Sequence, residues 1–211
     1  MAHKELFDFE HLLAQFTASK TPENDILIEH YLNAFNDLSR FFELLGTAFG
    51  FVSKDINEKI KILKAHQAEN PDHFVSIQAM VAYEVEKSLT KSKTPSGLVS
   101  GSRTLLRLHR TMDFVAKFLT RLKGMNDEDY TGKAASEEYN ISLGKFHPWM
   151  IRKMAGIAMY TLPTRKVFIE KYCKQNKERL EELVGPTSAM MTEIHEITEK
   201  LYGDHDLLQL P

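Results

Sequence analysis

The chain has 211 residues, of which 43% are hydrophobic and 27% are charged, and its formal net charge is −2. Such a composition is typical of a folded globular protein, and the length is sufficient for a sizeable core. The near-neutral charge argues against a general nucleic-acid binder, which usually presents a basic face. Cys173 is the only cysteine, which excludes an internal disulfide and fits a reducing compartment.

The sequence shows no segment typical of secretion or membrane insertion. The N-terminal residues carry acids among their apolar residues, unlike the uninterrupted apolar core of a signal peptide. No run approaches the roughly 20 apolar residues of a membrane span. We therefore expect a cytoplasmic protein that associates with cytosolic membrane faces only peripherally.

Nearly every periodic segment has the apolar spacing of an amphipathic helix. In chain order, we expect helices over residues 6–16, 27–45, 53–63, 73–89, 100–119, 134–145, 148–160, 164–172 and 178–202. Gly46 and Gly50 predict a kink or break after the second helix, and Ser53 is a candidate N-cap of the third. Gly185 and Pro186 mark another break or kink. No repeat or shift in composition divides the chain, so we predict a single all-α domain of about eight helices over residues 1–211.

The helix expected over residues 100–119 carries the most informative pattern. Residues three and four apart share a helix face, so Arg103, Arg107 and Arg110 lie within a narrow arc. Phe114 and Phe118 continue that face toward the C-terminus, over about 22 Å at 1.5 Å per residue. An ordinary core stripe occupies the opposite face: Leu105, Leu108 and Met112. A face that begins cationic and becomes aromatic suits an elongated anionic amphiphile with its head at the arginines.

These arginines lack acidic partners nearby in the sequence. No Asp or Glu occurs from Lys87 through Met112, so the usual ion pairs between residues four apart on an exposed helix are missing. The arginines could instead meet carboxylates of a distant helix or face water. Composition and spacing leave these alternatives open beside the binding of an anion.

Asp55 and Lys59 lie four residues apart on the third expected helix. One interpretation is a surface ion pair that stabilises the helix by a few tenths of a kcal/mol. The other is a carboxylate and an ammonium offered together to a polar ligand. Nothing in the neighbouring sequence decides between them.

His147 and Trp149 lie at the start of another expected helix, and Trp149 is the only tryptophan. Both residue types are more often structural than functional. Alternatively, His147 beside Pro148 presents a ring nitrogen at a fixed point. Trp149 is followed by apolar and basic residues in the mixture that membrane-surface helices carry.

A reaction centre is not evident. Zinc proteases need two histidines four apart, and the segment with Glu193, His195, Glu196 and Glu199 has only one, so we interpret it as a solvated face. Phosphate-cradling loops and the GxSxG motif are absent, and no motif surrounds Cys173. We therefore predict that the protein is not an enzyme and uses no metal and no cofactor.

Five blocks of the sequence resemble the glycolipid transfer protein superfamily, and they occur in that family's order. The blocks are LGTAFGFVSKDINEKI, SGSRTLLRLHRTMDFVAKFL, YNISLGKFHPWMIRKM, TLPTRKVFIEKY and KLYGDHDLLQLP. The similarity spans almost the whole chain and looks closest to the branch of ceramide-1-phosphate transfer proteins. It implies an all-helical two-layer fold that encloses one sphingolipid in an apolar pocket, and non-enzymatic transfer of that lipid between cytosolic membrane faces.

The resemblance also implies roles for individual residues. It places headgroup contacts at Asp55, Lys59, Arg103, Arg107, Arg110 and His147, and a membrane contact at Trp149. Arg103 and Arg107 match the phosphate-binding arginines of the ceramide-1-phosphate branch, and Arg110 matches a further basic position nearby. His147 matches the histidine that bonds the lipid amide.

The residues favour a phosphate over a sugar. Sugar-binding members of the family carry a tryptophan in the central helix, whereas this helix has arginines, which suit phosphate oxygens. Lys59, Arg103 and Arg107 would neutralise a phosphomonoester of charge near −2. Asp55 needs a donor on the ligand, which a ceramide supplies in its amide N–H and 3-hydroxyl, and His147 could donate to the amide carbonyl. Phosphatidic acid has neither of those donors.

We therefore predict a monomeric carrier whose ligand is ceramide-1-phosphate. A carrier of a neutral glycosphingolipid stays open within the same class. A lipid-responsive sensor or scaffold, or a helical module that binds phosphoinositide at a membrane surface without extracting it, stays open from other classes.

Overall fold

The structure, a computed structural model, describes residues 6–211. These residues form nine α-helices and two short 3-10 helices, with isolated β-bridges but no strand. The helices are α1 (Phe9–Ser19), α2 (Ile28–Leu44), η1 (Thr47–Phe49), α3 (Gly50–Glu69), α4 (Ile77–Glu86), α5 (Gly101–Lys123), α6 (Thr131–Ile141), η2 (Leu143–Phe146), α7 (Trp149–Tyr160), α8 (Arg165–Tyr172) and α9 (Lys177–Asp204). Among the described residues, no helix combines the length and the apolarity needed to cross a membrane.

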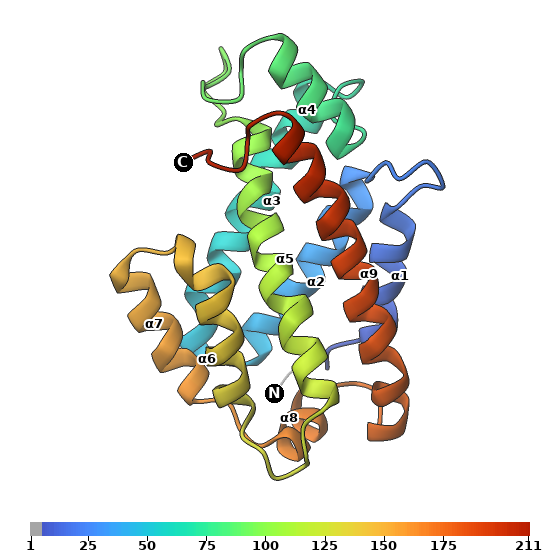
Figure 1. Ribbon diagram of the computed structural model, residues 1–211, viewed down its shortest axis with the longest axis vertical. Helices are drawn as coiled ribbons and strands as arrows, with labels where there is room; N and C mark the ends of the chain where they lie inside the picture. The colour runs from blue at the N-terminus through green and yellow to red at the C-terminus, as the bar shows by residue number, and fades with distance from the viewer. Residues whose placement is uncertain (1–5) are drawn as a thin grey trace.

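The long helices are arranged in two layers (Figure 1). α5 and α9 run side by side, and α2 packs against α3 behind them. α1 contacts both α2 and α9, while α3 contacts α5, so the layers meet along both edges. α6 packs against α5 and carries α7 on its other side. This arrangement confirms the predicted all-α, two-layer fold, with nine α-helices in residues 6–211 instead of about eight.

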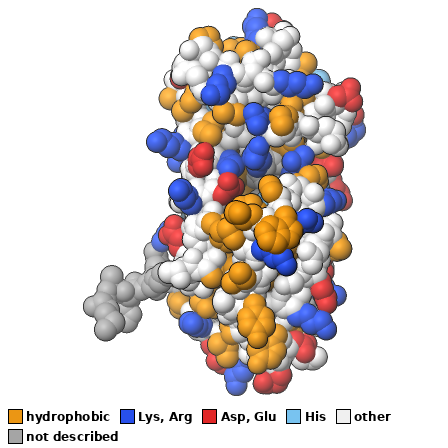
Figure 2. All heavy atoms as spheres, turned by 90° about the vertical axis from the view of Figure 1, so that its left-hand side faces the viewer, with side chains coloured by type: hydrophobic (Ala, Val, Ile, Leu, Met, Phe, Trp, Pro, Cys, Tyr) orange, Lys and Arg blue, Asp and Glu red, His pale blue; other side chains and the backbone are white. Residues whose placement is uncertain are grey.

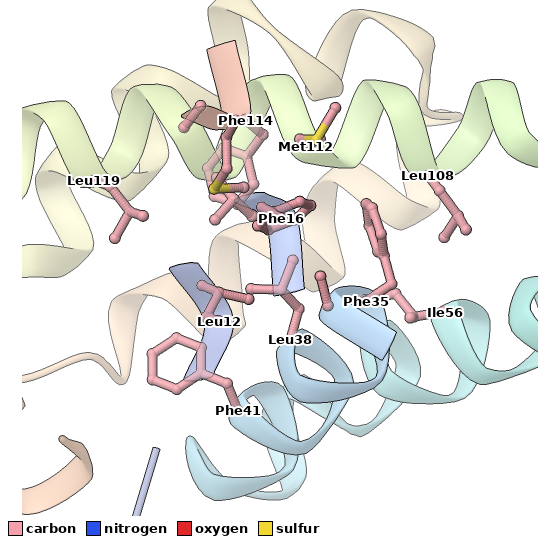
Figure 3. Packing of buried hydrophobic residues seen from close by; sticks show 14 of the residues in the cluster. Leu12, Phe16, Phe35, Leu38, Phe41, Ile56, Leu108, Met112, Phe114 and Leu119 are labelled. Atoms are coloured by element: carbon pink, nitrogen blue, oxygen red, sulfur yellow. The ribbon is translucent and has the colours of Figure 1, made fainter. Parts of the chain in front are cut away.

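Aromatic and aliphatic side chains fill the space between the layers. Figure 3 shows Leu108 of α5 pointing to the side on which Phe35 of α2 lies, and Met112 of α5 and Phe16 of α1 belong to the same cluster of buried residues. The rings of Phe16 and Phe35 pack edge to face, with centroids 6.3 Å apart. Complete burial of side chains of this size stabilises a fold by about 1.5–3 kcal/mol each. The apolar stripe of α5 is therefore its core face.

A buried carboxylate holds the N-terminus of α5. The Ser100 side chain caps the helix by accepting a hydrogen bond from the Arg103 N–H at 3.1 Å. Glu84 of α4, which is 1% exposed, accepts from the Ser100 hydroxyl at 2.7 Å. It also accepts from the N–H groups of Gly101 and Ser102, at 2.6 and 2.9 Å. The free N–H groups and the helix dipole both favour a carboxylate here, so Glu84 fixes the start of the helix that carries the arginines.

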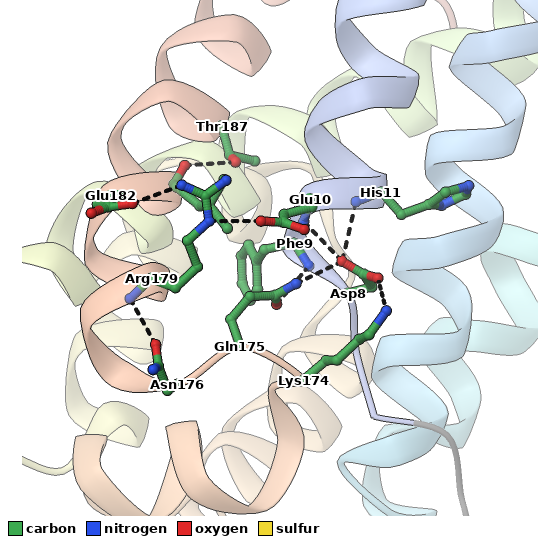
Figure 4. Close-up of polar contacts among 11 residues, drawn as sticks. Asp8, Phe9, Glu10, His11, Lys174, Gln175, Asn176, Arg179, Glu182 and Thr187 are labelled. Carbon is green, nitrogen blue, oxygen red and sulfur yellow. Dashed lines mark hydrogen bonds and ion pairs between the residues drawn. The ribbon is translucent and has the colours of Figure 1, made fainter.

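The start of α1 is tied to the segment between α8 and α9 (Figure 4). Asp8 caps α1 by accepting from the N–H groups of Glu10 and His11, at 3.0 and 3.2 Å. The same carboxylate accepts from Nζ of Lys174 at 2.6 Å and from Nε2 of Gln175 at 2.7 Å. These bonds join residues that lie 166 and 167 positions apart in the chain. They close the first helix onto the C-terminal part of the molecule.

Some predicted boundaries are wrong. α3 begins at Gly50, so Ser53 lies inside its first turn and donates to the Gly50 carbonyl at 3.1 Å instead of capping the helix. The helix expected over residues 73–89 covers only Ile77–Glu86, because the Ser76 side chain caps it at that point. By contrast, Pro186 lies inside α9, within the helix expected over residues 178–202, and does not break it. The predicted domain also includes residues 1–5, which lie outside the described residues.

Candidate binding site

A cavity of about 420 Å³ is lined by side chains of α1, α2, α3, α5, α6 and α7. Most of the lining is apolar and rich in phenylalanine. The charged or titratable side chains in the lining are Asp55, Arg107, Arg110, Tyr139 and His147. Phe114 and Phe118 line the same cavity as Arg107 and Arg110, as expected for one face of α5. The cavity can therefore accept a long apolar group that ends in a charged one.

Asp55 and Lys59 form an ion pair on consecutive turns of α3, in which Nζ of Lys59 donates to Oδ1 of Asp55. The Asp55 side chain is 59% exposed and lines the cavity, whereas the Lys59 side chain is 10% exposed and does not. The pair is therefore more than a solvated surface contact, because its ammonium is buried. Lys59 therefore adds positive charge next to the cavity without lining it, as the ion-pair partner of Asp55.

The three arginines of α5 have different surroundings. Arg107 is exposed and lines the cavity, and its side chain makes no hydrogen bond or ion pair within residues 6–211. Arg103 lies one turn earlier, outside the cavity lining, and its Nε donates to the main-chain oxygen of Pro211 at 2.5 Å. Nη2 of Arg110 donates to the main-chain oxygen of Leu208 at 2.8 Å. In the described part of the chain, none of the three pairs with an Asp or Glu side chain.

Arg110 is also in contact with a ring at the cavity wall. Its guanidinium carbon lies 3.9 Å from the centroid of the Phe146 ring in η2, which is within cation–π distance. Burial lowers the pKa of Arg110, and the neighbouring Arg107 lowers it further, while Glu199 acts in the opposite direction. An anion placed between Arg107 and Arg110 would relieve the repulsion between the two cations.

His147 follows η2 and is half-buried, with its Nδ1 2.7 Å from the hydroxyl of Tyr139. Burial lowers the pKa of His147, and the attraction of Asp55 opposes this effect. Arg107, Lys59 and Arg110 lower the pKa further. The ring is therefore neutral at pH 7. The pKa of His147 thus responds to the charges of four other predicted headgroup residues, which lie near it. The structure therefore brings together five of the six predicted headgroup residues, all except Arg103.

Trp149 belongs to an exposed apolar surface and not to the core. Its side chain is 65% exposed, and further exposed apolar residues of α7 and the adjoining segment are Ile141, Phe146, Met150, Met154, Ile157 and Tyr160. We call these seven residues the α7 apolar face. Figure 2 views the molecule from this side and shows apolar side chains gathered among lysines and arginines. Lys153 places its Nζ 5.7 Å from the Trp149 ring centroid.

The segment around His195 is only partly the solvated face that was predicted. Glu193, Glu196 and Glu199 are exposed, but the ring of His195 stacks on that of His109 in α5, with centroids 4.0 Å apart. Nε2 of His109 lies 2.6 Å from Oε2 of Glu199. The two rings are parallel within 3°, so their in-plane lone pairs do not converge on a common metal position.

Four residues that contribute to the site were not predicted from the sequence. They supply the hydroxyl of Tyr139, the ring of Phe146 and the main-chain oxygens of Leu208 and Pro211. The Leu208 and Pro211 contacts reach α5 across 98 and 108 positions of sequence, beyond any helical periodicity. The Tyr139 contact spans only eight positions, but α6 ends between its two residues.

Known proteins match this chain over almost its whole length. A family model described as glycolipid transfer protein (GLTP) matches residues 26–174. A ceramide-1-phosphate transfer protein of Xenopus laevis is 36% identical over 211 residues, which cover 99% of this chain and 98% of the relative. A glycolipid transfer protein of Danio rerio is 26% identical over 198 residues, which cover 92% of this chain and 91% of the relative.

The fold agrees with the sequence match. A crystal structure of human ceramide-1-phosphate transfer protein in complex with 2:0 ceramide-1-phosphate is similar with a TM-score of 0.90 at 32% identity. The similarity covers 98% of this chain and 100% of the human one. Because sequence and fold agree over nearly the full length, the chain belongs to the glycolipid transfer protein family.

Proposed function

We propose that this protein carries a phosphorylated sphingolipid, ceramide-1-phosphate, between membranes without changing it chemically. The observation that carries the proposal is Arg107, an exposed arginine without a partner in residues 6–211, at the wall of an apolar cavity. Arg110 stands beside it. Arginine binds phosphate oxygens through paired charge-assisted hydrogen bonds. The apolar lining suits the hydrocarbon chains of the same ligand.

The headgroup site combines four cations with one carboxylate. We assign the phosphate to Arg107 and Arg103, with Arg110 and the buried Lys59 adding positive charge. Arg103 reaches the ligand if it exchanges its bond to the Pro211 oxygen for one to phosphate. The relatives named as ceramide-1-phosphate transfer proteins support this ligand.

Asp55 and His147 supply the contacts that distinguish a ceramide from a glycerolipid. The Asp55 carboxylate can only accept hydrogen bonds, so it suits the amide N–H and the 3-hydroxyl. His147 suits the amide carbonyl, because an imidazole N–H can donate to that oxygen. Both Asp55 and His147 line the cavity beside the arginines. The absence of tryptophan from α5 argues against a sugar headgroup, which would gain more from aromatic stacking.

The α7 apolar face supplies the membrane contact in this proposal. Trp149 and its apolar neighbours can enter the interfacial zone of a bilayer, while Arg152 and Lys153 remain near anionic headgroups. Phe146 belongs both to this face and to the cavity lining. A docked protein would therefore present the cavity next to the bilayer surface.

The test is lipid transfer between vesicles by Arg107→Leu, with Arg121→Leu as the matched control. Arg121 lies on the same helix, is paired with Glu137 at 2.7 Å, and does not line the cavity. Loss of one charge-assisted hydrogen bond costs about 1.5–3 kcal/mol, so Arg107→Leu should weaken ceramide-1-phosphate binding roughly 10- to 150-fold. Arg107→Lys should restore only part of the loss, because lysine keeps the charge without the planar fork.

Arg121→Leu should change transfer by less than about twofold. All variants are compared at equal salt and checked for helical content by circular dichroism. Normal transfer by Arg107→Leu would show that the arginine face is solvated surface and that the phosphate assignment is wrong.

A further inference from the structure

The hydroxyl of Tyr139 approaches one specific nitrogen of His147. The phenol oxygen lies 2.7 Å from Nδ1, a normal hydrogen-bond distance. Tyr139 belongs to α6 and His147 follows η2, and both side chains line the cavity. Nε2 of His147 has no hydrogen-bond partner within residues 6–211, so it is the ring nitrogen left for a ligand.

The ring of Tyr139 is held in a fixed position. It is 4% exposed and packs edge to face against Phe114, with centroids 5.9 Å apart and planes at 89°. Gly144 lies close to the same residue, and a Cβ at Gly144 would come within 2.9 Å of the Tyr139 ring and 2.8 Å of the Tyr139 carbonyl oxygen. Only glycine leaves room for the ring at that distance. The packing around the ring therefore fixes the position of the Tyr139 hydroxyl next to His147.

The phenol has a proton to give to this hydrogen bond, whereas the single proton of a neutral imidazole resides on either ring nitrogen. Burial raises the pKa of Tyr139, so its hydroxyl stays protonated, and it has no other acceptor among the described residues. Burial lowers the pKa of His147, so the imidazole is neutral and carries one N–H. If the phenol donates to Nδ1, that single ring proton resides on Nε2.

We propose that Tyr139 is a positioning residue that holds His147 in the Nε2–H tautomer and thereby makes it a hydrogen-bond donor to the bound ligand. The opposite tautomer would offer a lone pair and would suit an N–H of the ligand instead of a carbonyl. Asp55 already provides an acceptor in the same lining. A donor and an acceptor together select a ligand that contains both a carbonyl oxygen and an N–H or O–H group, as an N-acyl amide does. The inference rests on the proposed function for the identity of this ligand, but the tautomer itself does not depend on a ligand.

The first experiment measures the tautomer in the lipid-free protein. Two-bond ¹H–¹⁵N spectra of protein labelled with ¹⁵N-histidine distinguish a protonated from an unprotonated ring nitrogen, and His147→Gln assigns the signals. We expect a protonated Nε2 and an unprotonated Nδ1 at pH 7.5. In Tyr139→Phe, the tautomers should mix and the pKa of His147 should rise, because the hydrogen bond to the lone pair of the neutral ring is lost.

The second experiment measures affinity for two probes, ceramide-1-phosphate and sphingosine-1-phosphate, which lacks the acyl carbonyl. Tyr139→Phe should weaken binding of ceramide-1-phosphate about tenfold, and binding of sphingosine-1-phosphate less than about twofold. Tyr31→Phe is the control, because Tyr31 is fully buried and its hydroxyl has no partner among the described residues. It should leave both affinities unchanged.

The outcomes separate this inference from the proposed function. A protonated Nδ1 in the wild-type protein overturns the role of Tyr139, whether or not the protein transfers lipid. Equal losses for both probes in Tyr139→Phe overturn it as well, because a purely structural role would not distinguish the carbonyl. Failure of the wild-type protein to bind either phosphate lipid would refute the proposed function and leave the tautomer measurement standing.

Discussion

Lys59 is a nearly buried cation whose ion-pair partner is Asp55. It is 8% exposed, and its ammonium donates to Asp55. Removing the Asp55 carboxylate leaves the buried Lys59 side chain without its ion-pair partner and is destabilising. Asp55 therefore has two roles, one as the partner of Lys59 and one as an acceptor in the cavity, and an experiment on Asp55 has to separate them.

Asp55→Asn should reduce the preference for ceramide-1-phosphate over phosphatidic acid. The change removes a charge that repels phosphate, and it weakens acceptance from the amide and hydroxyl that phosphatidic acid lacks. We expect the ratio of the two transfer rates to fall several-fold. The double variant Asp55→Asn/Lys59→Met serves as the control for stability, since it leaves no unpaired ammonium. An unchanged ratio in both variants would contradict the role of Asp55 in selection.

At the scale of the helix, the position of α5 depends on Glu84. Glu84→Gln keeps the shape of the side chain but removes the charge that three donors at the N-terminus of α5 share. We expect the free energy of unfolding to fall by about 1–3 kcal/mol, measured by urea denaturation. Glu86→Gln is the matched control on the same helix, because Glu86 is exposed and its partner is the exposed Lys87. Equal effects of the two changes would contradict this account.

The interface of α5 and α9 contains two stacked histidine rings, those of His109 and His195. Burial and then the neighbouring His109 lower the pKa of His195 to about 4, although Asp113 and Glu199 act in the opposite direction and Lys117 adds to the lowering. Two stacked imidazoles repel one another when both are protonated. The native state therefore binds fewer protons here than the unfolded chain does between the ordinary pKa of 6.5 and about 4.

The contribution of His195 to stability is fully present above pH 6.5 and is lost as the pH falls toward 4. Between pH 7.5 and pH 4.5, the wild type should lose about 1–3 kcal/mol more unfolding free energy than His195→Phe, which keeps a ring but cannot titrate. Urea denaturation at the two pH values measures the difference. Parallel losses in both proteins would exclude His195 as the source.

α7 presents its apolar face to solvent. We expect this face to act when the protein docks on a membrane during lipid transfer, and not in the binding of the lipid in the cavity. Trp149→Ala should slow transfer between vesicles more than it weakens binding of the lipid, because Trp149 does not line the cavity. Val75→Ala is the control, since Val75 is 54% exposed and lies outside the α7 apolar face. Transfer rate and affinity are measured on the same preparations. Unchanged transfer would mean that Trp149 is an ordinary exposed residue.

At the scale of the whole molecule, the family assignment confirms a protein that carries lipid and is not an enzyme. The surroundings of Cys173 agree with this, because burial raises the pKa of its thiol to about 12 and leaves no thiolate at neutral pH.

The parts of the structure that could be predicted from the sequence are those that repeat along one helix. The spacing of Arg107, Arg110, Phe114 and Phe118 was sufficient to place them on one face, since helical periodicity is local. The same rule could not show that Glu84 of α4 holds the start of α5. Such contacts depend on how helices pack against one another in the tertiary structure. The periodicity of one helix does not show which residues of another helix it contacts.

The core and the cavity of this protein are built from the same side chains. Phe9, Leu12, Leu38, Phe41 and Phe168 belong to the hydrophobic core and also line the cavity. An apolar ligand therefore completes the core when it enters, and it stabilises the folded state more as its concentration rises above its dissociation constant. Cellular proteases act on transiently opened chains, so the empty protein should be degraded faster than the loaded one. The abundance of the protein would then follow the supply of its own cargo, without any dedicated regulator.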